Sequence, residues 1–368
     1  MESPYEKSIR ERLEAEGDPV KRAILVAEQA GYLARTGQFA QAEATLAEVR
    51  RHFGDGRSGH VAVMLMCAEG LLAYFRDLDP QSYDRLARAQ LLSIAAKNAS
   101  LSALTSAWLA HIAFNLHRHD DMARAVRTCM QTLTADDLQA KCRISLTLGD
   151  AFLVLDEEAI ARRWYAEARE LAVRLGDHSA LSALIYNQAA LAVFNCRLGS
   201  LDRAIETQLV RDVASKVRSA TNFQGLAQLR SLQHLLDDAQ ASILILEGRF
   251  DEALRQIERV LGASIPISPS GHTVTALCDM AMCYASMGRR DDFNRTISEI
   301  DMSELERRTA DDRAVAFAAL RDAYLRFGQQ HEAQHFDQQM NDSLVEHRNR
   351  VSSLRTTLDP YQGTPLIQ

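Results

Sequence analysis

The apolar positions of this chain follow helical spacing, and almost no stretch shows the alternating pattern of a strand. A short pattern returns where helix-like stretches end: a glycine, one intervening residue, an aromatic residue, and an alanine three positions later. It is clearest at Gly37, Phe39 and Ala42. It recurs at Gly248, Phe250 and Ala253, with weaker echoes at Gly199 with Ala204, Gly288 with Phe293, and Gly328 with Ala333. Because each repeat buries its apolar face only against its neighbours, this repetition predicts a stack of helical hairpins.

The pattern also predicts where the hairpins turn. The intervals between turns are about 40 residues, and each has room for two helices. The chain is also rich in strong helix formers, so we expect an all-α, right-handed α-solenoid of about eight hairpins. Residues 263–271 hold two prolines and are expected to be non-helical, and residues 211–230 are expected to carry an extra turn or a displaced helix. The expected turns lie near Gly37, Asp79, Arg118, Asp156, Gly199, Gly248, Gly288 and Gly328.

The residues at these turns have interpretable roles. Glycine can adopt the left-handed conformation that ends the first helix. The aromatic residue fills the gap between the two helices, and the alanine lets them approach closely. Asp156, Asp251 and Asp291 lie where a carboxylate would cap the second helix or favour its first turn.

These features resemble the tetratricopeptide repeat family. The family's unit is about 34 residues, so the longer period here looks like the long-helix variants of bacterial regulatory and sensor proteins. The resemblance implies an N-terminal helix or cap (1–17), a repeat domain (18–339), a capping or coiled-coil helix (340–358) and a flexible tail (359–368). The matching positions are Ala161, Tyr165, Ala168, Ala241, Leu244, Phe250, Ala253, Ile257, Leu277, Met280, Ala281, Tyr284, Ile297, Phe317, Leu320, Tyr324 and Ala333.

Charge and composition narrow the functional classes. A net charge of −7 argues against a broad nucleic-acid surface, which would need clustered Lys and Arg. The polar N-terminus does not resemble a signal peptide, and no apolar run is long enough for a membrane span, so we expect a cytoplasmic protein. The cysteines lie in apolar segments without zinc-site spacing, and we expect buried reduced thiols. They are Cys67, Cys129, Cys142, Cys196, Cys278 and Cys283.

Two clusters of histidines suggest metal chemistry, but each has a structural explanation. Residues 331–335 read H-E-x-x-H, the zinc-hydrolase pattern in which His331 and His335 would bind the metal and Glu332 would act as the base. Ala333 is a packing position of the last repeat, so both histidines should face solvent. Residues 117–121 (His-Arg-His-Asp-Asp) fall at a predicted turn, where polar residues cap helix ends. We therefore expect no metal, no cofactor and no catalytic residues.

The first helices of stacked hairpins line the concave groove of a solenoid, which is its usual ligand surface. A groove that mixes Asp, Asn and aromatic residues would suit a peptide with a basic or amide-rich face. The alternative for each position is packing or solvated surface. Registration on the family places in or near this groove Trp108, Asn115, Tyr186, Asp238, Ser242, Asp279 and Asp322.

The C-terminal region has a different pattern. Its apolar residues recur in alternating steps of four and three, as in a heptad seam, with His347 as a polar interruption. The seam predicts a homodimer, and the alternative is a helix that caps the last repeat. Residues 358–365 weakly resemble the linker into a diguanylate cyclase (GGDEF) domain, through Asp359, Gly363 and Pro365. The seam residues are Met340, Leu344, Val351, Leu354 and Leu358.

The sequence therefore favours a non-catalytic scaffold or sensor in bacterial signalling that binds a protein or peptide segment in its groove. One alternative is the sensory part of a diguanylate cyclase-type protein. Another is a zinc hydrolase that uses the H-E-x-x-H segment.

Overall fold

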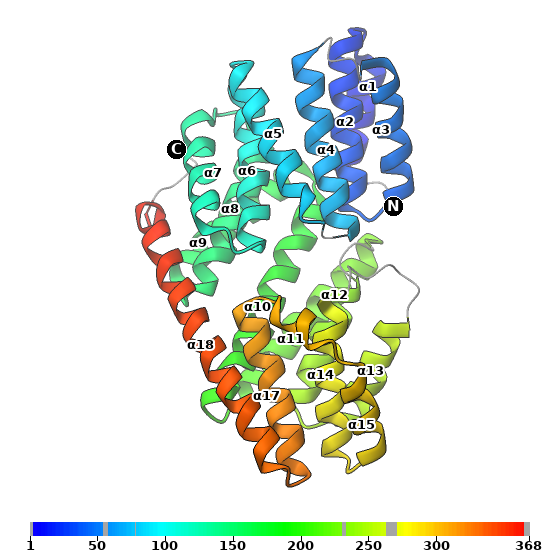
Figure 1. Ribbon diagram of the computed structural model, residues 1–368. Helices are drawn as coiled ribbons and strands as arrows, with labels where there is room; N and C mark the ends of the chain where they lie inside the picture. The colour runs from blue at the N-terminus through cyan, green and yellow to red at the C-terminus, as the bar shows by residue number, and fades with distance from the viewer. Residues whose placement is uncertain (1–2, 54–57, 78, 230–232, 263–270, 364–368) are drawn as a thin grey trace. The chain divides into compact units, whose positions relative to one another are not determined.

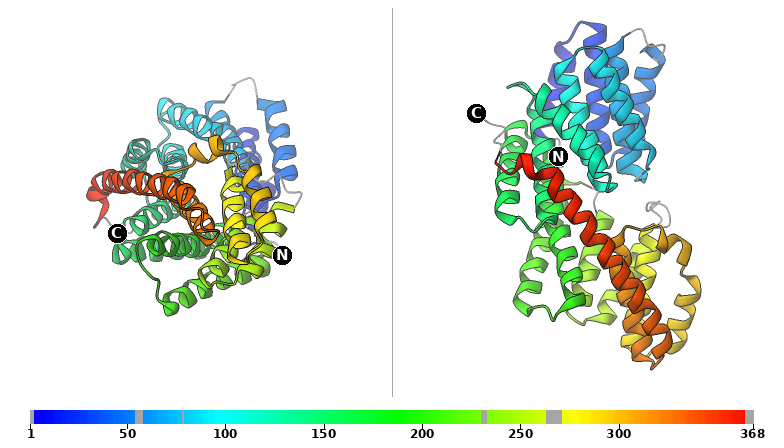
Figure 2. Two further views of the ribbon diagram at one scale, coloured as in Figure 1. Left: turned by 60° about the horizontal axis from the view of Figure 1, so that its bottom comes forward. Right: turned by 60° about the vertical axis from the view of Figure 1, so that its left-hand side comes forward.

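The prediction of an all-α fold is confirmed. The computed structural model describes residues 3–53, 58–77, 79–229, 233–262 and 271–363, and in these residues it contains eighteen α-helices and one short 3₁₀ helix (Figure 1). Most of the helices pair into antiparallel hairpins, as in a tetratricopeptide-like solenoid, and the paired helices lie side by side in both views of Figure 2.

The chain divides into two compact units. Unit 1 comprises Met1–Ile185, Phe223–Ser231 and Leu354–Gln368. Four hairpins form most of it: α2 with α3, α4 with α5, α6 with α7, and α8 with α9. The first helices pack on each other in two places, α2 on α4 and α6 on α8, whereas the second and third hairpins pack mainly through α5 on α6. The helices are α1 (Pro4–Ala15), α2 (Pro19–Arg35), α3 (Phe39–Phe53), α4 (Gly59–Asp77), α5 (Gln81–Ala95), α6 (Ala99–Asn115), α7 (His119–Thr132), α8 (Leu138–Val154) and α9 (Glu158–Leu175).

Unit 2 comprises Tyr186–Asn222 and Leu232–Ser353. Its hairpins include α12 with α13 and α14 with α15, and α14 also packs on α17. Three helices contribute residues to both units: α10 (His178–Asp202), α11 (Thr207–Ala227) and α18 (Gln330–Leu358). The others are α12 (Gln233–Leu246), α13 (Phe250–Gly262), α14 (Gly271–Ser286), α15 (Arg290–Glu299), α16 (Met302–Glu306) and α17 (Ala310–Arg326).

Six of the hairpin turns in the described residues share one main-chain hydrogen-bonding pattern. At the first turn, the N–H of Gln38 donates to the carbonyl of Leu33 (2.9 Å), and the N–H of Gly37 donates to that of Ala34 (3.1 Å). Gly37 is left-handed, with φ of 82°. This arrangement satisfies carbonyls that the end of a helix would otherwise leave unpaired. The same pattern recurs after α6, α8, α12, α14 and α17.

Two of these turns have no glycine. His117 and Asp156 occupy the left-handed position there, with φ of 54° and 61°. The expectation that Asp156 caps the second helix is therefore wrong, since Asp156 ends the first helix and Glu157 is the N-cap of α9. Asp251 and Asp291 do lie in the first turns of α13 and α15, as expected.

The turn expected near Gly199 falls a few residues later, at 203–206, and Gly199 does not form it. Gly199 lies inside α10, which continues to Asp202, and Ala204 is exposed rather than a packing position. A glycine inside a helix costs only about 1 kcal/mol, so the neighbouring residues can carry the helix through it. Residues 207–227 form the single helix α11. The proline-containing segment at 263–270 lies outside the described residues.

The packing alanines and the cysteines are where the sequence places them. Ala42, Ala253 and Ala333 are all buried. All six cysteines are buried as well. Burial raises the pKa of the Cys67 thiol to about 12, which keeps it protonated and inert.

The C-terminal seam is largely covered by the chain itself. Met340, Leu344, Leu354 and Leu358 are buried, and Met340 and Leu344 belong to the apolar core of unit 2. Val351 is half-buried. This burial is what a helix that caps the last repeat requires, whereas dimerisation through the seam stays a prediction.

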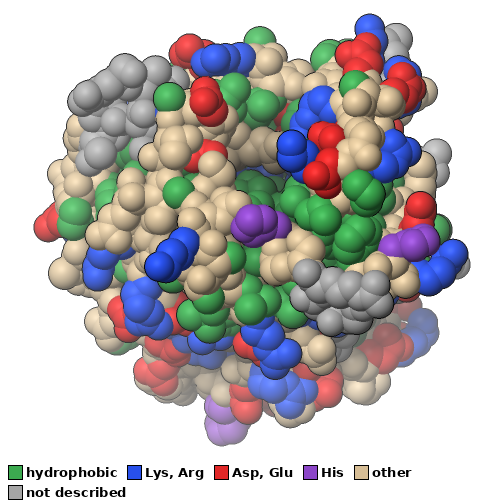
Figure 3. Space-filling view, turned by 90° about the horizontal axis from the view of Figure 1, so that it is seen from above, with side chains coloured by type: hydrophobic (Ala, Val, Ile, Leu, Met, Phe, Trp, Pro, Cys, Tyr) green, Lys and Arg blue, Asp and Glu red, His purple; other side chains and the backbone are tan. Residues whose placement is uncertain are grey.

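Basic and acidic side chains are interspersed on the face drawn in Figure 3. Within the described residues, no helix combines the length and apolar character that a bilayer crossing requires.

Candidate ligand-binding pocket

Unit 2 contains a pocket of about 290 Å³. Its walls come mainly from α10, α12, α14 and α17, which are first helices of successive hairpins, with Ile257 added from α13. Phe194, Leu191 and Val315 contribute apolar surface to these walls. The volume is close to the lower end of that of small-ligand sites, and it fits one or two peptide side chains.

Four residues that the sequence placed in the groove lie together in this pocket: Tyr186, Asp238, Ser242 and Asp279. All four are half-buried. They come together because each lies on the same face of its hairpin's first helix, and the pairing of the hairpins brings those faces into one surface.

The main polar group of the pocket was not predicted. Arg197 of α10 donates from Nη1 and Nη2 to the two carboxylate oxygens of Asp279 on α14, at 2.7 and 2.6 Å. Nη1 also lies 3.3 Å from the hydroxyl of Ser242. Burial alone would lower the pKa of Arg197, but the charge of Asp279 raises it above its ordinary value. The guanidinium is therefore a fixed cation that ties α10 to α14.

The pocket carries an excess of negative charge. A second arginine, Arg308, pairs with Asp312 at 3.3 Å. The lining thus contains two arginines against three aspartates, with Asp238 as the third. No histidine, cysteine or lysine is present among the described residues that line it. The chemistry suits recognition of hydrogen-bond donors and positive charge.

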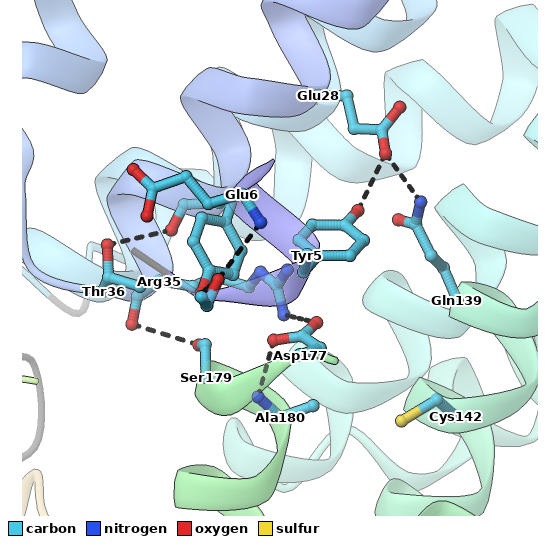
Figure 4. Close-up of polar contacts among 12 residues, drawn as sticks. Tyr5, Glu6, Glu28, Arg35, Thr36, Gln139, Cys142, Asp177, Ser179 and Ala180 are labelled. Carbon is cyan, nitrogen blue, oxygen red and sulfur yellow. Dashed lines mark hydrogen bonds and ion pairs between the residues drawn. The ribbon is translucent and has the colours of Figure 1, made fainter. Parts of the chain in front are cut away.

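Trp108 lies elsewhere, in a polar cluster of unit 1. The guanidinium of Arg143 stacks 3.8 Å from the Trp108 ring centre, and that of Arg35 lies 5.7 Å from it. Arg35 also donates to Asp177 at 2.8 Å, and both side chains are buried (Figure 4). The adjoining cavity is only about 40 Å³, room for about three waters, so it is too small for a peptide side chain.

Tyr5 and Glu28 complete this cluster. The Tyr5 hydroxyl donates to the Glu28 carboxylate at 2.8 Å, and Gln139 donates to the same oxygen at 2.9 Å (Figure 4). Burial and the charge of Glu28 raise the pKa of Tyr5 well above its usual value, which keeps the phenol protonated as a donor.

The other two residues expected in the groove lie outside both cavities. Asn115 is exposed and donates to the carbonyl of His111 in its own helix, at 2.8 Å. Asp322 pairs with the adjacent Arg321 at 2.8 Å. Both therefore have local structural partners.

The histidine motifs lie where their structural explanations place them. His331 and His335 are exposed on α18, while Ala333 between them is buried. In the 117–121 segment, Arg118 pairs with Asp121 at the start of α7. Over the described part of the chain, no three His, Cys, Asp or Glu side chains group as a metal site requires.

The chain is similar to solved structures, each at low sequence identity. No family model matches the chain, and no curated protein does. Among solved structures, one similar fold is a Rap protein complexed with Competence and Sporulation Factor, with 14% identity, a TM-score of 0.46, and coverage of 90% of this chain and 100% of that one. Another is the TPR domain of P58(IPK), with 14% identity, a TM-score of 0.32, and coverage of 93% and 80%. Neither bears on the cyclase-linker resemblance of the tail, where Asp359–Tyr361 form the 3₁₀ helix.

Proposed function

We propose that this chain is a non-catalytic receptor for a peptide or protein segment, which it binds in the pocket of unit 2. In this proposal it acts in the cytoplasm as a sensor or scaffold in bacterial signalling. The observation that supports it is the pocket itself, because first helices of successive hairpins form it and such surfaces are where helical solenoids hold extended ligands.

The lining indicates the kind of segment that would fit. Ser242, Thr275 and Tyr186 offer hydroxyl groups to main-chain N–H and C=O groups of a peptide. Phe194 and Leu191 offer apolar contact for a side chain. The excess of aspartates over arginines favours a ligand with a basic or amide-rich face.

A matched pair of variants tests this proposal. Asp238 and Asp322 are both half-buried aspartates on first helices, but only Asp238 lines the pocket. A random-peptide phage library would be selected on the full-length protein, and the selected peptides measured against Asp238→Arg and Asp322→Arg. We expect Asp238→Arg to weaken binding at least about tenfold and Asp322→Arg to change it less than about twofold.

Circular dichroism would establish that both variants are folded. The proposal fails if no peptide is enriched over a blank support, or if Asp322→Arg weakens binding as much as Asp238→Arg does.

A further inference from the structure

The N-terminal helix α1 is held on unit 1 by a narrow stripe of side chains. Of its twelve residues, only Tyr5 and Ile9 are buried. Leu13 is partly buried against the same cluster, which also includes Tyr32 and Leu175. The contacting residues are thus spaced as on one face of a helix lying in a groove.

Tyr5 makes the most specific contacts. Its ring lies 5.0 Å from that of Tyr32, and the guanidinium of Arg35 lies 5.8 Å from its centre. Its hydroxyl donates to Glu28, and its main-chain N–H donates to the carbonyl of Gly176 in the turn between α9 and α10, at 3.3 Å. Figure 4 shows the Tyr5 ring directed into this cluster. We call the residues that hold α1, which are Glu28, Tyr32, Arg35, Leu175 and Gly176, the seat of α1. The seat therefore accommodates an aromatic ring, a phenol hydroxyl and a main-chain N–H.

Arg12 extends the stripe by one turn. It lies seven residues after Tyr5 and pairs with Glu28, which accepts from Arg12 Nη2 at 2.8 Å. Glu28 is 9% exposed, whereas Arg12 is 46% exposed. The Glu28 carboxylate thus contacts two side chains of α1, Tyr5 and Arg12.

The structure also allows α1 to leave without unwinding its neighbour. The carboxylate of Asp18 caps α2 by accepting from the N–H groups of Val20 and Lys21, at 2.8 and 3.1 Å. The first turn of α2 is therefore capped by Asp18, and this cap does not depend on α1. A helix of this length is marginal alone in water, so α1 depends on its docking for order.

We propose that the seat of α1 is a helix-binding site in unit 1, occupied here by the chain's own N-terminus, and that it accepts in its place a partner helix with a Tyr-x3-Ile-x2-Arg stripe. The side chains of α1 that contact the seat indicate which side chains a partner helix would need. This inference involves only residues of unit 1, so its tests are independent of the ligand-binding pocket proposed in unit 2.

A fluorescent peptide with the sequence of residues 3–17 serves as the probe. In the full-length Tyr5→Ala/Ile9→Ala variant, α1 loses both anchors and the seat is open. We expect the peptide to bind this variant at least about tenfold more tightly than wild type, where the tethered α1 competes at high effective concentration. A peptide with the Tyr5→Ala change should not bind. The matched control protein is Lys7→Ala/Glu11→Ala, since that pair is exposed on the far face of α1, and it should behave as wild type.

Two further measurements keep the proposal open to refutation. Adding Glu28→Gln to the opened variant should weaken peptide binding about tenfold, because the peptide's tyrosine and arginine lose their shared charge. Amide hydrogen exchange on the wild-type protein should show α1 exchanging faster than α2. Equal protection of the two helices in the wild-type protein would overturn the proposal even if the opened variant does not fold. Equal binding of the two peptides to the folded opened variant would overturn it as well.

Discussion

The ion pair between Arg35 and Asp177 is expected to be a major determinant of the stability of unit 1. The two residues are 142 positions apart and join the end of α2 to the start of α10, with side chains only 7% and 5% exposed. Asp177 has a second role, since its other oxygen accepts from the N–H of Ala180 at 2.9 Å and caps α10. Substitutions can separate the two roles.

The expected changes in the free energy of unfolding follow from the burial of this ion pair. Asp177→Asn can keep the cap through its amide oxygen but leaves the Arg35 charge without its partner, which should lower the free energy of unfolding by about 3–5 kcal/mol. Asp177→Ala also removes the cap and should lower it by about 1 kcal/mol more. Arg35→Met leaves the carboxylate unpaired and should resemble Asp177→Asn. The double variant Arg35→Met/Asp177→Asn should recover most of the loss, because neither charge of the pair stays buried without the other.

Urea unfolding followed by tryptophan fluorescence would measure these changes. Both tryptophans of the chain, Trp108 and Trp164, lie in unit 1, so the signal reports that unit selectively. The exposed pair of Arg10 and Glu14 provides the control, and Arg10→Met should change stability by less than about 0.5 kcal/mol. Additive losses in the double variant, or single losses under about 1 kcal/mol, would refute the reasoning.

Three further expectations concern other parts of the chain. Gly149→Ala should lower the stability of unit 1 by about 1–3 kcal/mol in the same fluorescence assay, because the added Cβ atom would lie 2.8 Å from the Tyr165 ring. Gly225→Ala is the control, since its added Cβ atom would have no neighbour within 4 Å, and it should be neutral or stabilising. Burial, and next a neighbouring arginine, lower the pKa of His111 well below its usual value. The unfolded chain therefore binds a proton that the folded chain does not, so stability should fall by up to about 1.4 kcal/mol per pH unit below about pH 6.5, and His111→Gln should reduce that slope in urea titrations. Leu344→Asp should lower the thermal midpoint of unit 2, measured by circular dichroism, with no change in sedimentation mass if α18 is a cap; a halved mass with an unchanged midpoint would favour the dimer.

The repeat architecture was predictable because it depends on local spacing. The turn at Gly248 and the packing position at Ala253 each follow from a few neighbouring residues. The same rule failed at Gly199, because a glycine inside a helix leaves the same local signal as one that ends it. Only the residues that follow decide between the two.

The candidate pocket was predictable in part, for the same reason. Asp238 and Asp279 were expected from their positions on first helices, which the repeat register supplies. Arg197 was missed because its partner Asp279 is 82 residues away, and no local pattern connects them. Trp108 was expected at a groove but lies in a buried cluster, since the register indicates which way a side chain faces and not what covers it.

The turns without glycine have a consequence for how such a chain can change over time. His117 and Asp156 occupy a backbone conformation that disfavours most side chains, yet their turns have the same main-chain hydrogen bonds as the turn at Gly37. A repeat built this way can lose its signature residues one at a time while each hairpin still closes. The spacing of the helices then preserves the architecture, while substitutions can accumulate until little of the repeat consensus is recognisable in the sequence.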